Sequence, residues 1–374
     1  MATGILSQVR RTALSVAIGL VVALAGARGE ALGEGLLRIA DCRIVDDNGP
    51  VKAMGVNYVD GFWQFASDGR REAYLPALDA LAAAQIPFIR MAFGPWAPID
   101  FGKPPSPAII DFVAHRELYF ERLDAFLDDA KARHIGVVLD VFWGVDPYAI
   151  YFGDPPSAWS DPNSKTFAFL RDVVGELGQR RGTDPTIWMV EFLNEGDLFI
   201  DFPAAPHSRS EFIALIDGLA DALRAAGDRH LIDTGNSLPR PAAEHLDELE
   251  GWKTDAADEF LRALDAETPA RFEVASVHIY PEEKPTRPWD DGDILQTLPI
   301  LEAHSRKSCQ PVFVGEFGST DPTVNAAYIE RIARSDIPMA AVWGFGRIRS
   351  DPFTFGFDAR GRERLRRIGP GNPG

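Results

Sequence analysis

The chain has 374 residues and a formal net charge of −17, because 55 Asp and Glu residues outnumber 38 Lys and Arg residues. This acid excess argues against a nucleic-acid partner and against docking on an anionic membrane, since both present negative charge that Lys and Arg must meet. Hydrophobic residues make up 46% of the chain, which excludes a disordered protein and leaves room for one large α/β barrel or two smaller domains.

Residues 1–27 have the pattern of a secretory signal peptide. A basic pair, Arg10 and Arg11, precedes an uncharged run that ends in a small-residue cleavage signal at residues 25–27. The run is shorter than the roughly 20 residues of a membrane span, so we expect cleavage rather than an anchor, with no stable membrane association afterwards. The basic pair matches a twin-arginine signal only in part, which leaves the export route open. We expect a secreted or periplasmic protein in which residues 28–374 form a single domain.

A β-hairpin is predicted next. Residues 38–45 and 51–55 flank an Asp-Asp-Asn-Gly-Pro turn at residues 46–50. Of the two cysteines, Cys42 lies in this hairpin and Cys309 lies just before a predicted strand. Because export permits disulfides, the two could pair at the bottom of one barrel, and two separate buried thiols are the equal alternative.

From residue 55 onwards, short apolar runs alternate eight times with helical patterns. The predicted strands, rich in Val, Ile and Phe as expected for burial on both faces, are residues 55–58, 87–93, 136–142, 187–193, 231–235, 274–280, 311–317 and 340–345. The predicted helices are residues 72–85, 116–133, 167–180, 210–226, 258–265, 293–304, 324–334 and 362–368. Strand–helix alternation implies a parallel sheet, so the chain is predicted to be an α/β protein, a (β/α)8 TIM barrel with an N-terminal β-hairpin. A doubly wound nucleotide-binding sheet is disfavoured, because no GxGxxG motif follows the first strand.

Two glutamates end predicted strands on the face where barrel enzymes carry out their chemistry. Asn194-Glu195 ends the fourth predicted strand and Glu316 ends the seventh, so the two carboxyl groups are expected to face each other across the barrel mouth. Glycoside hydrolysis needs such a pair, one acid to protonate the leaving oxygen and one carboxylate to attack or to activate water. Further polar and aromatic residues that end predicted strands are Asn57, Arg90, Trp143, His278, Tyr280 and Trp343.

Together these residues resemble the motifs of glycoside hydrolase family 5, the cellulase and β-mannanase family of clan A. The resemblance covers most of the chain, from residue 55 to residue 346. Asn194-Glu195 is similar to the family's Asn-Glu pair after strand four, which implies that Glu195 is the acid/base. Glu316 lies in Val-Gly-Glu-Phe-Gly and is similar to the nucleophile after strand seven.

The resemblance extends to the substrate-binding residues of the family. Arg90 is similar to the strand-two Arg that binds near the nucleophile, and His278 with Tyr280 is similar to the His-x-Tyr of strand six. Trp343 is similar to the strand-eight Trp that forms the floor of a sugar subsite. The chain departs from the family at the end of strand three, where residues 140–143 contain no His. This departure and a long aromatic loop lead us to favour a mannanase-like cleft slightly.

These roles predict a retaining double displacement. Ionised Glu316 would attack the anomeric carbon while protonated Glu195 gives its proton to the departing oxygen, and Glu195 would then deprotonate the incoming water. We expect Arg90 and Tyr280 to favour the charged form of Glu316, and burial to keep Glu195 protonated. Asn194 would bind the sugar hydroxyl next to the anomeric carbon. A retaining pair lies about 5–5.5 Å apart and an inverting pair roughly 6.5–9.5 Å apart.

Aromatic residues support a sugar substrate, because flat C–H faces of sugar rings pack on indole. Of the eight Trp residues, Trp188 alone lies away from the predicted carboxyl-end loops. The long loop at residues 143–164, with Tyr148, Tyr151 and Trp159, is predicted to be a wall of the binding cleft, and a locally packed loop is the alternative. The expected partner is a neutral β-glycan, either endo-cleaved β-1,4-mannan or β-1,4-glucan.

Three other functions are weighed against this one. An exo-acting β-glycosidase of the same clan and a non-catalytic carbohydrate-binding barrel both share the fold, although loss of catalysis normally replaces one of the two glutamates. A metal-dependent barrel hydrolase is disfavoured, because the seven His residues show no HxH or HExxH spacing. We therefore expect no metal and no cofactor, and make no prediction of oligomeric state. Two further acids, Asp140 and Glu191, are expected to have supporting roles.

Overall fold

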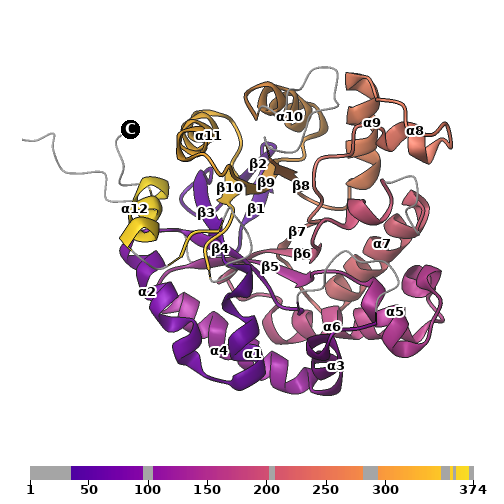
Figure 1. Cartoon of the computed structure of the whole chain (residues 1–374), viewed down its shortest axis with the longest axis horizontal. Helices are drawn as coiled ribbons and strands as arrows, with labels where there is room; N and C mark the ends of the chain where they lie inside the picture. Colours follow the sequence, from indigo (N-terminus) through magenta and orange to yellow (C-terminus); the bar gives the residue numbers. More distant parts are fainter. Residues whose placement is uncertain are drawn as a thin grey trace, which may run out of the picture. The chain divides into compact units, whose positions relative to one another are not determined.

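Parallel β-strands form the centre of the protein, and helices surround them (Figure 1). The computed structural model describes residues 35–95, 104–201, 207–280, 294–346, 354–356 and 359–369. The predicted signal peptide lies outside these residues. In sheet order, the eight strands of the described part are β7 (Leu231–Asp233), β6 (Ile187–Leu193), β5 (Gly136–Phe142), β4 (Phe88–Ala92), β3 (Ala53–Asn57), β10 (Met339–Val342), β9 (Val312–Phe317) and β8 (Ala275–Ile279).

Every neighbouring pair in this sheet is parallel. The two outermost strands, β7 and β8, also meet. The N–H of Val274, just before β8, donates to the carbonyl of Ile232 on β7 at 3.4 Å. The predicted (β/α)8 TIM barrel is therefore confirmed, and most strand ends lie within two residues of the predicted ones. The largest difference is in β10, which ends at Val342, three residues before its predicted end. β7 ends at Asp233, two residues early, because Gly235 has a left-handed backbone with φ +72°.

The helices alternate with the strands around the barrel (Figure 1). They are α1 (Trp63–Asp68), α2 (Leu75–Ala83), α3 (Pro107–Ala114), α4 (Arg116–Lys131), α5 (Asp146–Phe152), α6 (Lys165–Arg181), α7 (Arg209–Ala225), α8 (Ala243–Asp247), α9 (Ala257–Glu267), α10 (Ile294–Ser308), α11 (Pro322–Arg334) and α12 (Ala359–Ile368). Each predicted helix is present. The short helices α1, α3, α5 and α8 were not predicted; they lie in the connections that lead from a strand to its long helix.

Side-chain caps fix where several long helices begin. Ser164, Ser208 and Asp321 each accept a hydrogen bond from a backbone N–H in the first turn of α6, α7 and α11, respectively. Such caps satisfy donors that the helix itself leaves unpaired. All described residues belong to one compact unit, residues 33–374. Among those residues, no helix has both the length and the apolar character that crossing a bilayer requires.

Inward-facing positions change from apolar to polar along the barrel axis. One buried apolar cluster is formed by side chains near the amino-terminal ends of the strands. They include Phe88, Val138, Met189, Leu231 and Phe313. Side chains on a strand alternate between its two faces, so the next inward positions lie two residues further on. On the first four of these strands they are Arg90, Asp140, Glu191 and Asp233, all buried. The upper layer of the barrel is thus polar and rests on an apolar base.

The N-terminal hairpin is present, and it contains a turn that the sequence did not predict. Strands β1 (Arg38–Ala40) and β2 (Arg43–Val45) pair antiparallel around a two-residue turn of Asp41 and Cys42. Both turn residues have positive φ, 49° and 58°, which matches the strand twist in two-residue hairpins. The predicted turn at residues 46–50 is also present, because Val45 and Pro50 form an antiparallel bridge and the N–H of Val51 donates to the carbonyl of Ile44 at 2.9 Å. Beyond it the chain enters the barrel as β3, so the predicted second hairpin strand, residues 51–55, continues into a barrel strand.

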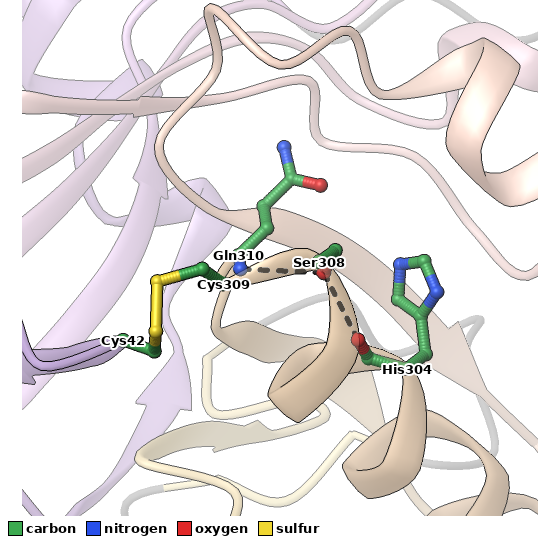
Figure 2. Close-up of a disulfide and its surroundings, with 5 residues drawn as sticks. All are labelled: Cys42, His304, Ser308, Cys309 and Gln310. Atoms are coloured by element: carbon green, nitrogen blue, oxygen red, sulfur yellow. Dashed lines mark hydrogen bonds between the residues drawn. A yellow bond between two sulfur atoms is a disulfide. The ribbon is translucent and has the colours of Figure 1, made fainter.

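This hairpin closes the base of the barrel. Leu37, Ile44 and Val51 belong to the same buried cluster as the apolar base layer. A disulfide between Cys42 and Cys309 ties the hairpin turn to the residue that follows α10 (Figure 2). The structure thus favours a disulfide over two separate thiols.

Removing the disulfide is expected to destabilise the barrel. The two half-cystines are 267 residues apart, so the bond restricts most of the unfolded chain. A Cys42→Ser/Cys309→Ser variant should lose about 2–5 kcal/mol of unfolding free energy, measured by thermal and urea denaturation. Dithiothreitol should lower the melting temperature of the parent to that of the variant and leave the variant unchanged. Equal melting temperatures for the oxidised parent and the variant would contradict the prediction.

Candidate active site

Arg90 on β4 lies at the centre of a buried polar cluster at the carboxyl ends of the strands. Its side chain is fully buried. Nη1 donates to Oε1 of Glu316 at 2.6 Å and to Oδ1 of Asn57 at 3.0 Å. Nη2 donates to Oδ1 of Asn194 at 2.8 Å, and Nε donates to Oε1 of Glu191 at 2.9 Å. One guanidinium therefore joins β3, β4, β6 and β9, and the planar fork of donors explains why an arginine suits this position.

The two predicted catalytic glutamates face the same space. Nδ1 of His278 lies 3.0 Å from Oε1 of Glu195 and 3.6 Å from Oε1 of Glu316. The hydroxyl of Tyr280 donates to Oε2 of Glu316 at 2.6 Å. One carboxylate oxygen of each glutamate and one ring nitrogen of His278 all lie within 4.8 Å of one another. The structure thus brings together residues that are 121 positions apart in the chain (316 − 195).

Glu316 is more deeply buried than Glu195, whereas we expected burial to act mainly on Glu195. The side chain of Glu316 is 5% exposed and that of Glu195 is 19% exposed. Burial raises the pKa of Glu316, while the charge of Arg90 and the hydrogen bond from the Tyr280 hydroxyl act against that rise. Burial also lowers the pKa of His278, so its imidazole is neutral at neutral pH. Arg90 and Tyr280 do favour ionised Glu316, as expected, but they do so against the cost of burial.

Buried acids beneath the site share a single positive charge. Asp140 and Asp233 flank Glu191 in the sheet, each paired with it in register. Burial, reinforced by the charge of Glu191, raises the pKa of both aspartates well above the usual value. This environment favours the protonated form of both aspartates, and Arg90 is the cation that contacts Glu191 and Glu316. The sequence analysis missed Asp233. It could have been found because Asp233 lies two residues after Leu231 on the same strand, so both side chains point to the same face of the sheet.

Three indole rings lie beside one another at the mouth. The ring centroids of Trp143 and Trp343 are 6.3 Å apart, and those of Trp63 and Trp143 are 5.8 Å apart in an edge-to-face arrangement. Nε1 of Trp63 donates to the carbonyl of Gly94 at 3.0 Å. The backbone N–H of Trp343 donates to the carbonyl of Phe317, the neighbour of Glu316. Trp63 was not among the predicted site residues, although it begins α1 in the connection after β3, where the sequence predicted sugar-binding aromatics.

The loop at residues 143–164 differs from the predicted cleft wall. It contains α5, and its residues Tyr148 and Trp159 are buried. The ring of Trp159 stacks on the imidazole of His207 with centroids 3.6 Å apart. The rings of Tyr148 and Trp159 pack on aromatic residues outside the loop, so both are packing residues and not an exposed cleft wall. Tyr151 is 37% exposed.

Two groups of side chains in the described ranges have a spacing that could hold an ion: Glu195 with His278 and Glu316, and His245 with Asp255 and Glu259. In the first group, the Arg90 guanidinium already contacts Glu316, and a second cation there would be repelled. In the second group, Asp255 accepts hydrogen bonds from the ring of His245 and from the backbone N–H of Glu244. In both groups, protein donors therefore already contact one of the carboxylates.

Comparison with known proteins identifies the fold. No protein-family model and no curated protein sequence matches the chain. The endo-1,4-β-mannanase of Rhizomucor miehei is similar in structure, with a TM-score of 0.64 and 17% identity over 89% of this chain and 98% of that one. A glycoside hydrolase family 5 mannosidase from Rhizomucor miehei has a TM-score of 0.62 and 14% identity over 90% of this chain and 97% of its own.

The catalytic domain of Thermobifida fusca endoglucanase Cel5A is also similar. Its TM-score is 0.53 with 17% identity, and the match covers 83% of this chain and 85% of that domain. Mannan-cleaving and glucan-cleaving barrels thus appear together among the similar structures. The chain has a (β/α)8 barrel fold like that of glycoside hydrolase family 5 structures, as the sequence motifs implied.

Proposed function

We propose that the protein is a retaining glycoside hydrolase that cleaves a neutral β-linked polysaccharide, with Glu316 as nucleophile and Glu195 as acid/base. The observation that carries the proposal is the pair of facing carboxyl groups, whose nearest oxygens lie within 4.8 Å across His278. That separation suits direct attack on the sugar, whereas an inverting enzyme needs about 6.5–9.5 Å for an intervening water.

In the first step, an oxygen of Glu316 forms a bond to the anomeric carbon as the glycosidic C–O bond breaks. The proton of Glu195 moves to the departing oxygen, which leaves as an alcohol. In the second step, Glu195 takes a proton from water, whose oxygen displaces Glu316 from the sugar. Arg90 and the Tyr280 hydroxyl support the charge on Glu316 before attack and after its release.

The indoles of Trp63, Trp143 and Trp343 support a neutral sugar substrate, because they form an apolar aromatic group at the carboxyl ends of the strands. The names of the similar structures, an endo-1,4-β-mannanase and an endoglucanase, favour β-1,4-mannan or β-1,4-glucan cleaved within the chain. Exo action on the same linkage is the alternative.

Export to the periplasm or medium is part of the proposal. The Cys42–Cys309 disulfide supports it, because such bonds persist in oxidising compartments. A mature chain that begins at Arg28 would agree with cleavage after Ala27.

Release of reducing ends from mannan, glucomannan, cellulose derivatives and β-1,3-glucan tests the activity. We expect release from mannan or a β-1,4-glucan. Proton NMR of the first product, before mutarotation, tests the stereochemistry, and we expect the β-anomer. An initial α-anomer would refute the retaining mechanism, and absence of release from every β-glycan would refute the hydrolase itself.

Tyr280→Phe is expected to move the acid limb of the pH profile for kcat/KM to higher pH. Glu316 must be ionised to attack, so activity rises as pH increases through its pKa. Tyr280 donates a hydrogen bond to Glu316 that lowers this pKa, and its loss raises the pKa further. A hydrogen bond to a charged group contributes roughly 1.5 kcal/mol or more, which corresponds to a shift of about one pH unit.

Tyr119→Phe is the matched control for this change. Tyr119 on α4 also donates to a carboxylate, Oδ2 of Asp111 at 3.0 Å, but it lies in the helix layer. Its variant should keep the acid limb of the parent. An unchanged limb in Tyr280→Phe would show that the tyrosine does not support the charged nucleophile.

A further inference from the structure

Glu195 has a strained backbone. Its φ is 50° and its ψ is 47°, which lie in the left-handed region of the backbone map that residues other than Gly, Asn and Asp rarely adopt. β6 ends two residues earlier at Leu193, and a short 3₁₀ helix, Gly196–Phe199, follows at once. Strain of this kind persists only where the surroundings hold it in place. The contacts of the next few residues therefore decide where the Glu195 carboxyl points.

The loop after β7 supplies those contacts. The N–H of Glu195 donates to the carbonyl of Gly235 at 2.8 Å. Asp197 lies two residues after Glu195, and Ser237 lies two residues after Gly235. The N–H of Ser237 donates to Oδ1 of Asp197 at 2.8 Å, and the Ser237 hydroxyl donates to Oδ2 of the same carboxylate. Nη2 of Arg240 donates to the Ser237 hydroxyl oxygen at 3.3 Å. Asp197 is fully buried and Ser237 is 4% exposed, so water does not compete for these bonds.

Gly235 makes this close approach possible. Its φ is +72°, and a Cβ there would overlap the carbonyl oxygen of Leu193 and come within 2.6 Å of the Glu191 side chain. The N–H of Gly235 also donates to Oδ1 of Asp233 at 2.8 Å, which fixes the turn from the β7 side. Backbone contacts thus hold the loop after β7 against the end of β6, and the hydrogen bonds between Asp197 and Ser237 add a side-chain contact to them.

We propose that Asp197 and Ser237 are positioning residues for Glu195. Their hydrogen-bonded pair holds the left-handed turn so that the Glu195 carboxyl stays against His278 and opposite Glu316. Neither residue contacts the reacting atoms in this arrangement; both act through the backbone of Glu195. The inference rests on the proposed function, since it assumes that Glu195 is the proton donor. A displacement of about 1 Å in a catalytic group can reduce the rate about 10²-fold.

Leaving-group dependence separates this role from general stabilisation. A poor leaving group such as phenolate needs the proton of Glu195, whereas 2,4-dinitrophenolate departs without it. The probes are phenyl and 2,4-dinitrophenyl β-mannobioside or β-cellobioside, whichever sugar the parent hydrolyses. kcat/KM is compared, because it reports only the steps up to formation of the glycosyl-enzyme.

Ser237→Ala should lose about 10²-fold in kcat/KM on the phenyl glycoside and only a few-fold on the dinitrophenyl glycoside. Asp197→Ala should show the same pattern, and Ser237→Thr, which keeps the hydroxyl, should recover most of the loss. Azide should raise kcat of Ser237→Ala on the dinitrophenyl substrate, because it attacks the glycosyl-enzyme without a general base. Ser237→Ala is the milder change and keeps the test valid if Asp197→Ala does not fold.

Ser335→Ala is the control, since the Ser335 hydroxyl donates to the carbonyl of Ile332 at the end of α11 and lies away from the site. It should keep the parent's ratio between the two substrates. Equal losses on both substrates in Ser237→Ala, or no loss on either, would overturn the positioning role while leaving the hydrolase in place. A parent that hydrolyses neither substrate nor any β-glycan would instead refute the proposed function, and the positioning role with it.

Discussion

Glu316→Gln is expected to abolish hydrolysis, with a fall in kcat of about 10⁴- to 10⁶-fold, the range seen when a covalent nucleophile is removed. The amide is neutral and cannot form the glycosyl-enzyme. It is nearly the same size as the carboxylate, and its oxygen can still accept the hydrogen bond from Arg90. The fold and the sugar contacts should therefore survive. The measurement is reducing-end release on the best substrate, together with the binding constant for that glycan.

Glu330→Gln is the matched control for this variant. Glu330 is an exposed glutamate on α11 that pairs with Arg334. The same chemical change there should leave kcat and KM at the values of the parent. If Glu316→Gln retained a tenth or more of the parent's activity, another group would have to be the nucleophile. If the parent bound a glycan but never cleaved it, the carbohydrate-binding alternative would be correct.

Arg90→Met is expected to cost about 3–5 kcal/mol of unfolding free energy and to remove activity, because it leaves buried carboxylates without their counter-charge. Arg90 contacts Glu191 and Glu316 at the same time, and its own side chain is fully buried. In the variant, burial acts on Glu316 without the guanidinium that lowers its pKa. Glu316 then takes up a proton at higher pH, so the stability deficit should be smaller at pH 5 than at pH 8. Urea denaturation at the two pH values measures it.

Two further variants make this result interpretable. Arg306→Met removes an exposed arginine that pairs with Asp336, and it should change stability by less than about 1 kcal/mol. Arg90→Met/Glu191→Gln removes one uncompensated charge, so it should be more stable than Arg90→Met alone. An Arg90→Met protein as stable as the parent would mean that the carboxylates are not ionised around Arg90, contrary to the charge distribution described above.

Much of the fold could be predicted because barrel strands have a simple pattern. They are buried on both faces and therefore appear as short continuous apolar runs, and the eight runs matched β3 to β10 closely. The short helices α1, α3, α5 and α8 carry too few turns to show a helical period, so they were missed. The turn at residues 46–50 was recognised because Asp-Asp-Asn-Gly-Pro is a strong turn signal, whereas the turn of Asp41 and Cys42 between β1 and β2 was missed because that pair carries a weaker one.

The candidate site was predictable to the extent that its residues end strands. Parallel strands bring their carboxyl ends to one rim, so Arg90, Asn194, Glu195, His278 and Glu316 could be placed together without coordinates. What lay beyond that rule was missed. Asp233 ends β7 in the structure but lay inside the longer strand predicted at residues 231–235, and Ser237 lies in a loop. Neither carries a motif, and each gains its role only from the side chain that the fold places beside it.

The amino-acid sequence by itself determined that this protein is a (β/α)8 barrel and which polar side chains meet at its mouth. It could do so because apolar runs, helical periods and strand ends are local properties of the chain. The tertiary structure alone decided how the charged groups are arranged there: Glu316 is more deeply buried than Glu195, and one arginine contacts both Glu316 and Glu191. It also decided that Gly235 and Ser237 hold the turn of Glu195. Desolvation and hydrogen bonding depend on neighbours far away in the chain, and only the folded barrel specifies those neighbours.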